Sequence, residues 1–204
     1  YILSLLMIVG LATTSYSKSN KIGENIDVTH YEIHLNEINI SDRTLDANTI
    51  ISLKTLSSLD ELDLELKSLN VSSVTSDDVI INNFSQNGDI LNITFENSVP
   101  ANTDISLSID YGGSTFNENW GGIHWSNDYV YNLGVGFDSQ PHNLGKTWFP
   151  CVDNFTDKAS YDLYITLPND MVSSCGGLLS ETNDNGNGTK TDHWVVNQEI
   201  ATFL

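Results

Sequence analysis

Apolar and polar side chains alternate along much of this chain with a period of two residues. In residues 31–35, 62–66 and 105–109, every second position is apolar and the positions between them are polar. This is the period of a β-strand with one buried face, whereas a helix would scatter the same apolar residues around its circumference. No window of 11 or more residues has an apolar stripe at helical spacing. We therefore predict strands here and, from similar runs, at residues 50–56, 79–81, 90–95, 161–167 and 193–196.

Turn-forming residues separate the predicted strands. Asn87-Gly88-Asp89 divides two of them, Gly112-Gly113 follows another, and residues 184–188 precede the last. Asn, Asp and Gly are favoured in turns because they tolerate positive φ angles. Residues 28–204 contain no internal repeat and no Pro- or Ser-rich linker. The pattern predicts one all-β domain, a sandwich or open barrel with mostly antiparallel strands.

The first residues differ from the rest of the chain. Residues 1–12 are almost entirely apolar and are followed by mostly small polar residues at 13–17, the order found in a secretory signal peptide. Twelve apolar residues are too few to span a bilayer. With no initiator Met and no basic segment, residues 1–17 are predicted to be a signal peptide that lacks its start, and residues 18–27 a linker. The protein would then be exported, to the periplasm or the extracellular space. The alternative is a buried N-terminal strand or helix.

The charge balance excludes some partners. Among 204 residues there are 8 Lys and Arg against 27 Asp and Glu, for a formal net charge of −19. Phosphate backbones and anionic membrane surfaces are bound by clustered basic residues, and the chain has no basic run. We therefore expect no nucleic-acid partner and no membrane association of the mature form.

The two cysteines, Cys151 and Cys175, are 24 residues apart. In an oxidising compartment this pair favours a disulfide, which we predict. Two buried free thiols, or one nucleophilic thiol, are the alternatives. Neither cysteine has a second zinc ligand at short spacing, so a zinc site is not indicated.

Two further patterns resemble metal sites. His30 and His34 are four residues apart, a zinc spacing on a helix, but the alternation around them is that of a strand. A strand separates them by about 13 Å, which one zinc ion cannot span. Residues 183–188, Asn-Asp-Asn-Gly-Asn-Gly, lack the terminal Asp and Glu of an EF-hand loop. We expect solvent-facing histidines and a hairpin turn.

Residues 134–168 carry a more specific signal. They contain a glutamine, a Pro-Cys-x-Asp turn, a lysine and an aromatic-containing strand that ends at a proline, in the order Gln140, residues 150–153, Lys158, residues 161–167 and Pro168. An opening strand with His-Tyr lies at residues 28–35, and Glu-Ile-Ala-Thr-Phe-Leu closes the chain at residues 199–204. In this order the segments resemble the amino-terminal domain of the M1 family of zinc aminopeptidases, over residues 28–204.

The resemblance implies a saddle-like β domain of an exported zinc metallopeptidase that cleaves peptides at their amino ends. The family's His-Glu-x-x-His zinc site and its Gly-x-Met-Glu-Asn loop belong to the next domain, so we expect both beyond Leu204. Zinc would be the cofactor of the intact enzyme. A peptide substrate and the missing catalytic domain would be the partners. This chain would supply no catalytic residue and no metal ligand, and it would be inactive alone.

The resemblance also implies one substrate-binding residue. In the family, this domain contributes an acidic or amide side chain that recognises the substrate's free α-amino group. An ungapped count from Cys151 places that role at Pro141, which has no suitable side chain. The neighbouring Gln140 is therefore the candidate, and an exposed turn amide with no such role is the alternative. Asn154-Phe155 replaces the family's usual residues after the Asp, which indicates a divergent branch.

Two other functions remain open. One is a non-catalytic exported β-sandwich that binds glycan or protein through a platform of aromatic and histidine side chains, namely Trp120, His124, Trp125, Tyr129 and Tyr131. The other is a structural domain of an M1-like protein that has lost its zinc. Near the Pro-Cys turn, we expect Trp148, Phe149 and Phe155 to pack that turn onto the sheet rather than to contact substrate.

Overall fold

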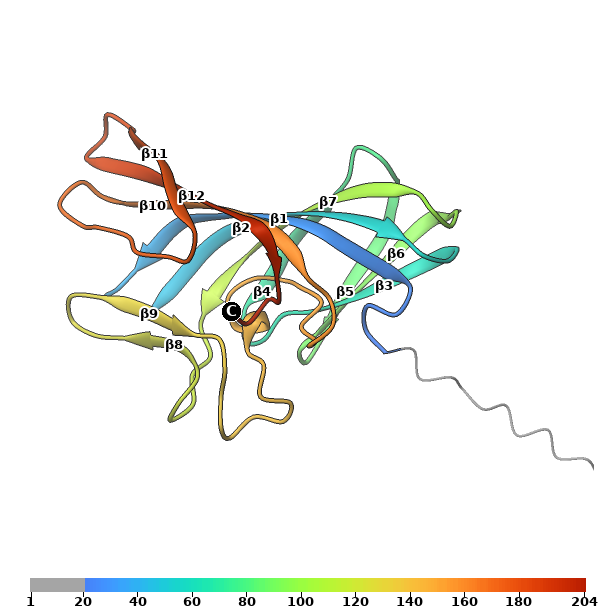
Figure 1. Ribbon diagram of the computed structural model, residues 1–204, viewed down its shortest axis with the longest axis horizontal. Coiled ribbons are helices and arrows are strands. Elements are labelled where there is room, and N and C mark those ends of the chain that lie inside the picture. The colour runs from blue at the N-terminus through green and yellow to red at the C-terminus, as the bar shows by residue number, and fades with distance from the viewer. Residues whose placement is uncertain (1–20) are drawn as a thin grey trace, which may run out of the picture.

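The computed structural model describes residues 21–204, and the predicted signal peptide at residues 1–17 lies outside them. The described chain is almost entirely β, as predicted (Figure 1). Its elements are β1 Ile26–Asn39, β2 Thr44–Thr55, β3 Leu59–Glu65, β4 Asn70–Thr75, β5 Ile81–Asn87, β6 Ile90–Val99, β7 Asp104–Ser114, β8 Gly122–Trp125, β9 Val130–Leu133, the 3-10 turn η1 Gly145–Thr147, β10 Ala159–Pro168, β11 Leu178–Asp184 and β12 Thr189–Ile200.

The strands form three sheets. Seven of them make the main sheet, in the order β11-β12-β10-β1-β2-β7-β4, and a second sheet has the order β3-β6-β5. Strands β8 and β9 form a separate hairpin. All pairs are antiparallel except β1 with β10, which run parallel from His30 opposite Ser160 to Leu35 opposite Ile165. The mostly antiparallel sandwich predicted from the sequence is confirmed.

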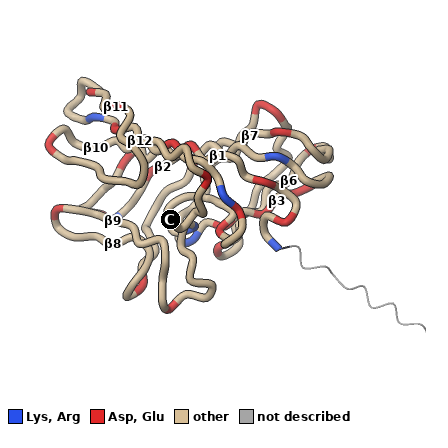
Figure 2. The backbone as a smooth tube through the Cα atoms, viewed as in Figure 1, with Lys and Arg blue, Asp and Glu red and all other residues tan. Residues whose placement is uncertain are grey.

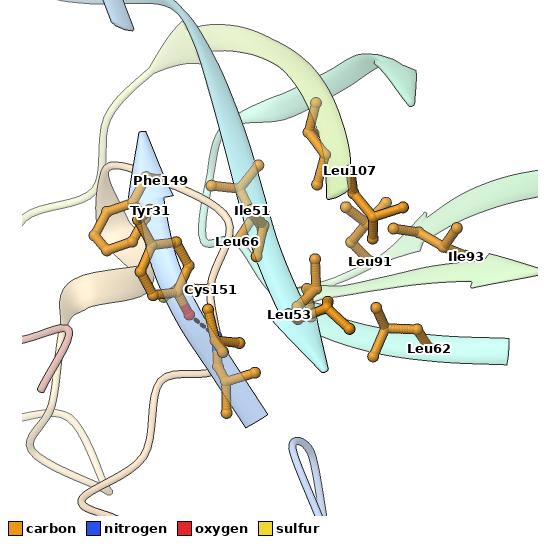
Figure 3. Packing of buried hydrophobic residues seen from close by; sticks show 14 of the residues in the cluster. Tyr31, Ile51, Leu53, Leu62, Leu66, Leu91, Ile93, Leu107, Phe149 and Cys151 are labelled. Carbon is orange, nitrogen blue, oxygen red and sulfur yellow. Dashed lines mark hydrogen bonds between the residues drawn. The ribbon is translucent and has the colours of Figure 1, made fainter. Parts of the chain in front are cut away.

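The core lies between the main sheet and the three-stranded sheet (Figure 3). The leucines at positions 62, 64 and 66, predicted to share one strand face, are all buried against apolar residues of the main sheet. Tyr31 from β1 is fully buried, and its ring stacks on Tyr161 of β10 with centroids 5.4 Å apart. Two stacked aromatic rings therefore stabilise the parallel pair β1 and β10 on its buried face.

Two of the predicted turns differ in outcome. Residues 184–188 form the turn of the β11–β12 hairpin, with Gly186 and Gly188 at positive φ, as expected. Gly112 and Gly113, in contrast, lie inside β7 and not in a turn. The reason for glycine at position 112 is close approach, because a Cβ there would lie 2.7 Å from the carbonyl oxygen of Leu45 on β2.

Acidic residues are spread over the loops and strands, and basic residues are few (Figure 2). Within residues 21–204, no helix has the length and apolar character needed to cross a membrane.

The stability of the domain is expected to depend on pH through Asp157. Its Oδ1 accepts a hydrogen bond from the Val28 N–H at 3.5 Å, and its Oδ2 is buried with no partner among the described residues. Burial, reinforced by the charge of Asp27, raises the pKa of Asp157 from 3.8 to about 6. The folded state therefore binds the proton of Asp157 more tightly than the unfolded chain does. The stability that the protonated carboxyl contributes is lost as the pH rises from 3.8 through about 6.

We expect Asp157→Asn, which cannot titrate, to remove this contribution. Between pH 4 and pH 7, the free energy of unfolding of the unchanged protein should fall relative to that of the variant by about 1–2 kcal/mol, allowing for partial solvent screening. Urea denaturation at several pH values measures both proteins. Two curves that stay parallel over this range would contradict the prediction.

Candidate functional site

The Pro-Cys-x-Asp segment, residues 150–153, is buried and tied to both sheets. Cys151 exchanges two backbone hydrogen bonds with Glu65 at the end of β3, with N···O distances of 2.8 and 3.0 Å. The Val152 N–H donates to the hydroxyl of Tyr31 at 3.1 Å (Figure 3). These bonds satisfy backbone groups that have no access to water, so the segment has one defined position.

A buried cluster of charged side chains lies beside this segment. The Lys146 ammonium lies 2.6 Å from Glu65 Oε1 and 3.8 Å from Asp153 Oδ2. Burial alone would lower the pKa of Lys146, but the hydrogen bond and charge of Glu65, with the charge of Asp153, hold it above its ordinary value. Burial raises the pKa of Glu65, and Lys146 offsets part of that rise. The 2.6 Å contact between Lys146 and Glu65 favours the charged form of both side chains at neutral pH.

Asp153 also fixes the last described residues of the chain. Its Oδ1 accepts a hydrogen bond from the Thr202 hydroxyl at 2.7 Å, and the backbone carbonyl of Asp153 accepts one from Asn143. Gly145 allows close approach, since a Cβ there would lie 2.7 Å from the Thr202 carbonyl oxygen. The segment after β12 therefore packs against η1 and the Pro-Cys segment.

Both cysteines are free thiols in the structure, so the predicted disulfide is not formed. Cys151 is fully buried in the core, and burial, with the charges of Asp153 and Glu65, raises its pKa well above the ordinary value. Cys175 lies in the connection between β10 and β11, near Asp192, and burial raises its pKa to about 11. The two thiols lie in different surroundings, and neither is an activated nucleophile.

Gln140 lies on an exposed loop, residues 134–142, between β9 and η1. Its Nε2 is 3.2 Å from His142 Nε2, and the bond to Pro141 is cis. Glu118 holds the loop from the side, because its carboxylate accepts hydrogen bonds from the Asp138 N–H at 2.9 Å and the Ser139 hydroxyl at 2.6 Å. The Ser139 bond is the main reason why the pKa of Glu118 is lowered. Sequence reasoning did not single out Glu118.

Aromatic side chains are exposed around the same loop. Trp120 and Phe137 are 53% and 69% exposed, and their rings stack with centroids 6.1 Å apart. Tyr129 and Tyr131 of the β8–β9 hairpin are also exposed and stack at 6.0 Å. Trp125, by contrast, is partly buried and its indole N–H donates to the Thr115 hydroxyl. The predicted platform is therefore exposed in part.

The aromatic residues near the Pro-Cys segment also differ in burial. Phe149 is fully buried with its ring against Tyr31 and Trp148, as expected. Phe155 is 58% exposed and contacts Phe203 instead of the sheet, so its predicted packing role is wrong.

The described residues do not fit a zinc ion. In residues 21–204, no three His, Cys, Asp or Glu side chains converge in an arrangement that could hold a metal. His30 and His34 lie on strand β1, as predicted, and each faces a carboxylate: His30 Nε2 is 3.1 Å from Asp162, and His34 Nε2 is 2.7 Å from Glu32. Asp162 also faces His193.

The described chain is thus a β-sandwich in which a Pro-Cys-x-Asp segment is buried between β9 and β10 in sequence. The family model described as the peptidase M1 N-terminal domain matches residues 27–204. The chain therefore belongs to the M1 peptidase family, as its amino-terminal domain, and the resemblance found in the sequence is confirmed. No curated protein matches the chain.

Solved structures of M1 zinc metallopeptidases have the same fold. A two-domain M1 zinc metallopeptidase bound to L-tryptophan matches with a TM-score of 0.77 and 20% identity, over 88% of this chain and 41% of that one. The M1 zinc metallopeptidase of Deinococcus radiodurans matches with a TM-score of 0.75 and 20% identity, over the same shares. A form of it bound to a Tyr-Ser-Ala substrate matches with a TM-score of 0.74 and 21% identity, over 88% and 41%. The chain thus spans about 41% of the length of these relatives.

Proposed function

We propose that this chain is the domain of an exported zinc aminopeptidase that forms one wall of the substrate cleft and binds the amino end of the peptide. The observation that carries the proposal is the position of Gln140. It is exposed on a loop that is held by Glu118 and leads directly into η1, against which the last described residues pack. A domain that follows in the intact enzyme would start close to this loop.

The chemistry of Gln140 suits an ammonium ligand. Its amide nitrogen faces His142, and its amide oxygen is an acceptor for N–H groups. Glu118 and Asp138 place carboxylates at the loop, and residues 68–145 contain no Lys or Arg. The potential of such a surface attracts the positive amino terminus of a peptide. The related enzymes bound to L-tryptophan and to Tyr-Ser-Ala support a ligand of this kind.

Zinc belongs to the intact enzyme in this proposal, and a catalytic domain beyond Leu204 would hold it. When bound there, zinc would polarise the scissile carbonyl and activate a water molecule. Residues 21–204 would shape the cleft and position the peptide's amino end, and this chain alone would hydrolyse no peptide. Export follows from the signal peptide proposed at residues 1–17.

Replacing Gln140 by Ala in the intact enzyme is expected to lower kcat/KM for aminoacyl substrates by about 10- to 100-fold, because one hydrogen bond to a charged group is lost. Gln140→Glu keeps an acceptor and should retain most of the activity. Hydrolysis of fluorogenic aminoacyl amides measures both. Equal losses in the two variants, or no loss in either, would contradict the proposed role.

A second candidate is a non-catalytic exported domain that binds glycan or protein. The exposed rings of Trp120, Tyr129 and Tyr131 favour it, because exposed aromatic faces stack on sugar rings. The DNA sequence downstream of the Leu204 codon distinguishes the two. A frame that continues into His-Glu-x-x-His supports the peptidase, and one that ends or lacks these ligands supports the binding domain.

A further inference from the structure

The most exposed pair of stacked aromatic rings lies next to the candidate amine-binding residue. Trp120 precedes β8 and Phe137 lies in loop 134–142, and more than half of each side chain is exposed. Large apolar side chains exposed together mark a surface that meets another molecule. Gln140 is three positions after Phe137, and an extended chain spans at most about 10 Å over that length.

The two rings and the loop form one unit. The Phe137 N–H donates to the Trp120 carbonyl oxygen at 3.3 Å, and the carboxylate of Glu118 binds the next two residues of the loop. Gly136 has no room for a side chain, since a Cβ there would lie against Glu118 and Leu144. Trp120, Phe137 and Asp138 therefore keep a fixed relation to one another, and Gln140 follows two residues after Asp138.

The unit combines three recognition elements: a flat apolar face, an amide acceptor and a negative potential. The amino-terminal residue of a peptide presents the complementary set, an ammonium group with a side chain attached to the neighbouring carbon. An ammonium bound at Gln140 would place that side chain within reach of Phe137. An aromatic side chain gains from stacking on such a face beyond the burial of its area.

We propose that Trp120 and Phe137 form an aromatic wall that contacts the side chain of the substrate's first residue, so that the enzyme prefers peptides with an aromatic or large aliphatic amino-terminal residue. This inference rests on the proposed function and adds a specificity to it. Tyr129 and Tyr131 lie on the β8–β9 hairpin rather than on the loop and are not part of the wall.

The test compares two substrates in the intact enzyme. The ratio of kcat/KM for a phenylalanyl amide to that for an alanyl amide is measured for the unchanged protein, Trp120→Ala, Phe137→Ala and the double variant. We expect the double variant to lower this ratio about tenfold and each single variant to lower it less. Tyr129→Ala is the matched control, because it also removes an exposed ring, and it should leave the ratio unchanged.

The outcomes separate the wall from the proposed function. If the double variant hydrolyses both amides but the ratio is unchanged, the wall is wrong and the peptidase assignment stands. Equal losses on both amides would mean that the rings support the domain interface, which also overturns the wall. If the unchanged zinc-loaded protein cleaves neither amide, the proposed function fails and the wall fails with it. Thermal unfolding of each variant excludes a folding defect, because both rings are exposed and their loss should cost little stability.

Discussion

Replacing Lys146 by Met should destabilise the domain by about 3–5 kcal/mol, because the change leaves one buried and one largely buried carboxylate without their cation. The Lys146 side chain is 9% exposed, and those of Glu65 and Asp153 are 16% and 0% exposed. Chemical denaturation at neutral pH measures the loss. Burial raises the pKa of Glu65, so at lower pH this unpaired carboxylate can take up a proton and the cost should shrink.

Lys67→Met is the matched control. Lys67 pairs with Asp89 at 3.2 Å, but the two side chains are 24% and 40% exposed, and its ammonium lies 4.4 Å from the ring centroid of Phe116. Exposed pairs of this kind contribute about 1 kcal/mol or less. A Lys146 variant that loses no more stability than the Lys67 variant would show that the buried cluster does not hold the Pro-Cys segment in place.

Phe149→Ala is expected to cost about 3–5 kcal/mol as well, through the cavity it leaves and the apolar area it exposes. The Phe149 ring is fully buried, 5.2 Å from that of Tyr31 and 4.5 Å from that of Trp148. Phe155→Ala removes the same side chain from a site that is 58% exposed, and should cost less than about 1 kcal/mol. Similar denaturation midpoints for the two variants would contradict the assigned packing.

Strands with strong alternation were predictable from the sequence alone. Tyr31 and Ile33 are fully buried as their period indicates, because the face that a strand side chain occupies depends only on its position in the pleat. The pattern does not indicate β11, because all seven of its residues are exposed at a sheet edge and it has no buried face. The pairing of β1 with β10 was also missed, because no local pattern specifies a partner so distant in sequence.

The candidate site was predictable in part. Gln140 and the Pro-Cys segment stand out through their resemblance to a family, and both lie in the connection between β9 and β10, on either side of η1. The partnership of Lys146 with Glu65 spans 81 residues and depends on packing that the sequence does not display. The one available signal is that a lysine stands five residues before Cys151 in a chain with only eight basic residues.

The parallel pairing of β1 with β10 has a consequence during synthesis. His30 and Ser160, which are hydrogen-bonded across this pair, are 130 residues apart. A ribosome adds about 5–20 residues per second, so one edge of β1 waits roughly 6–26 s for its neighbour. Until then that edge has unpaired backbone groups and can associate with other nascent chains. Pairing between segments so distant in sequence predicts slow folding of this domain.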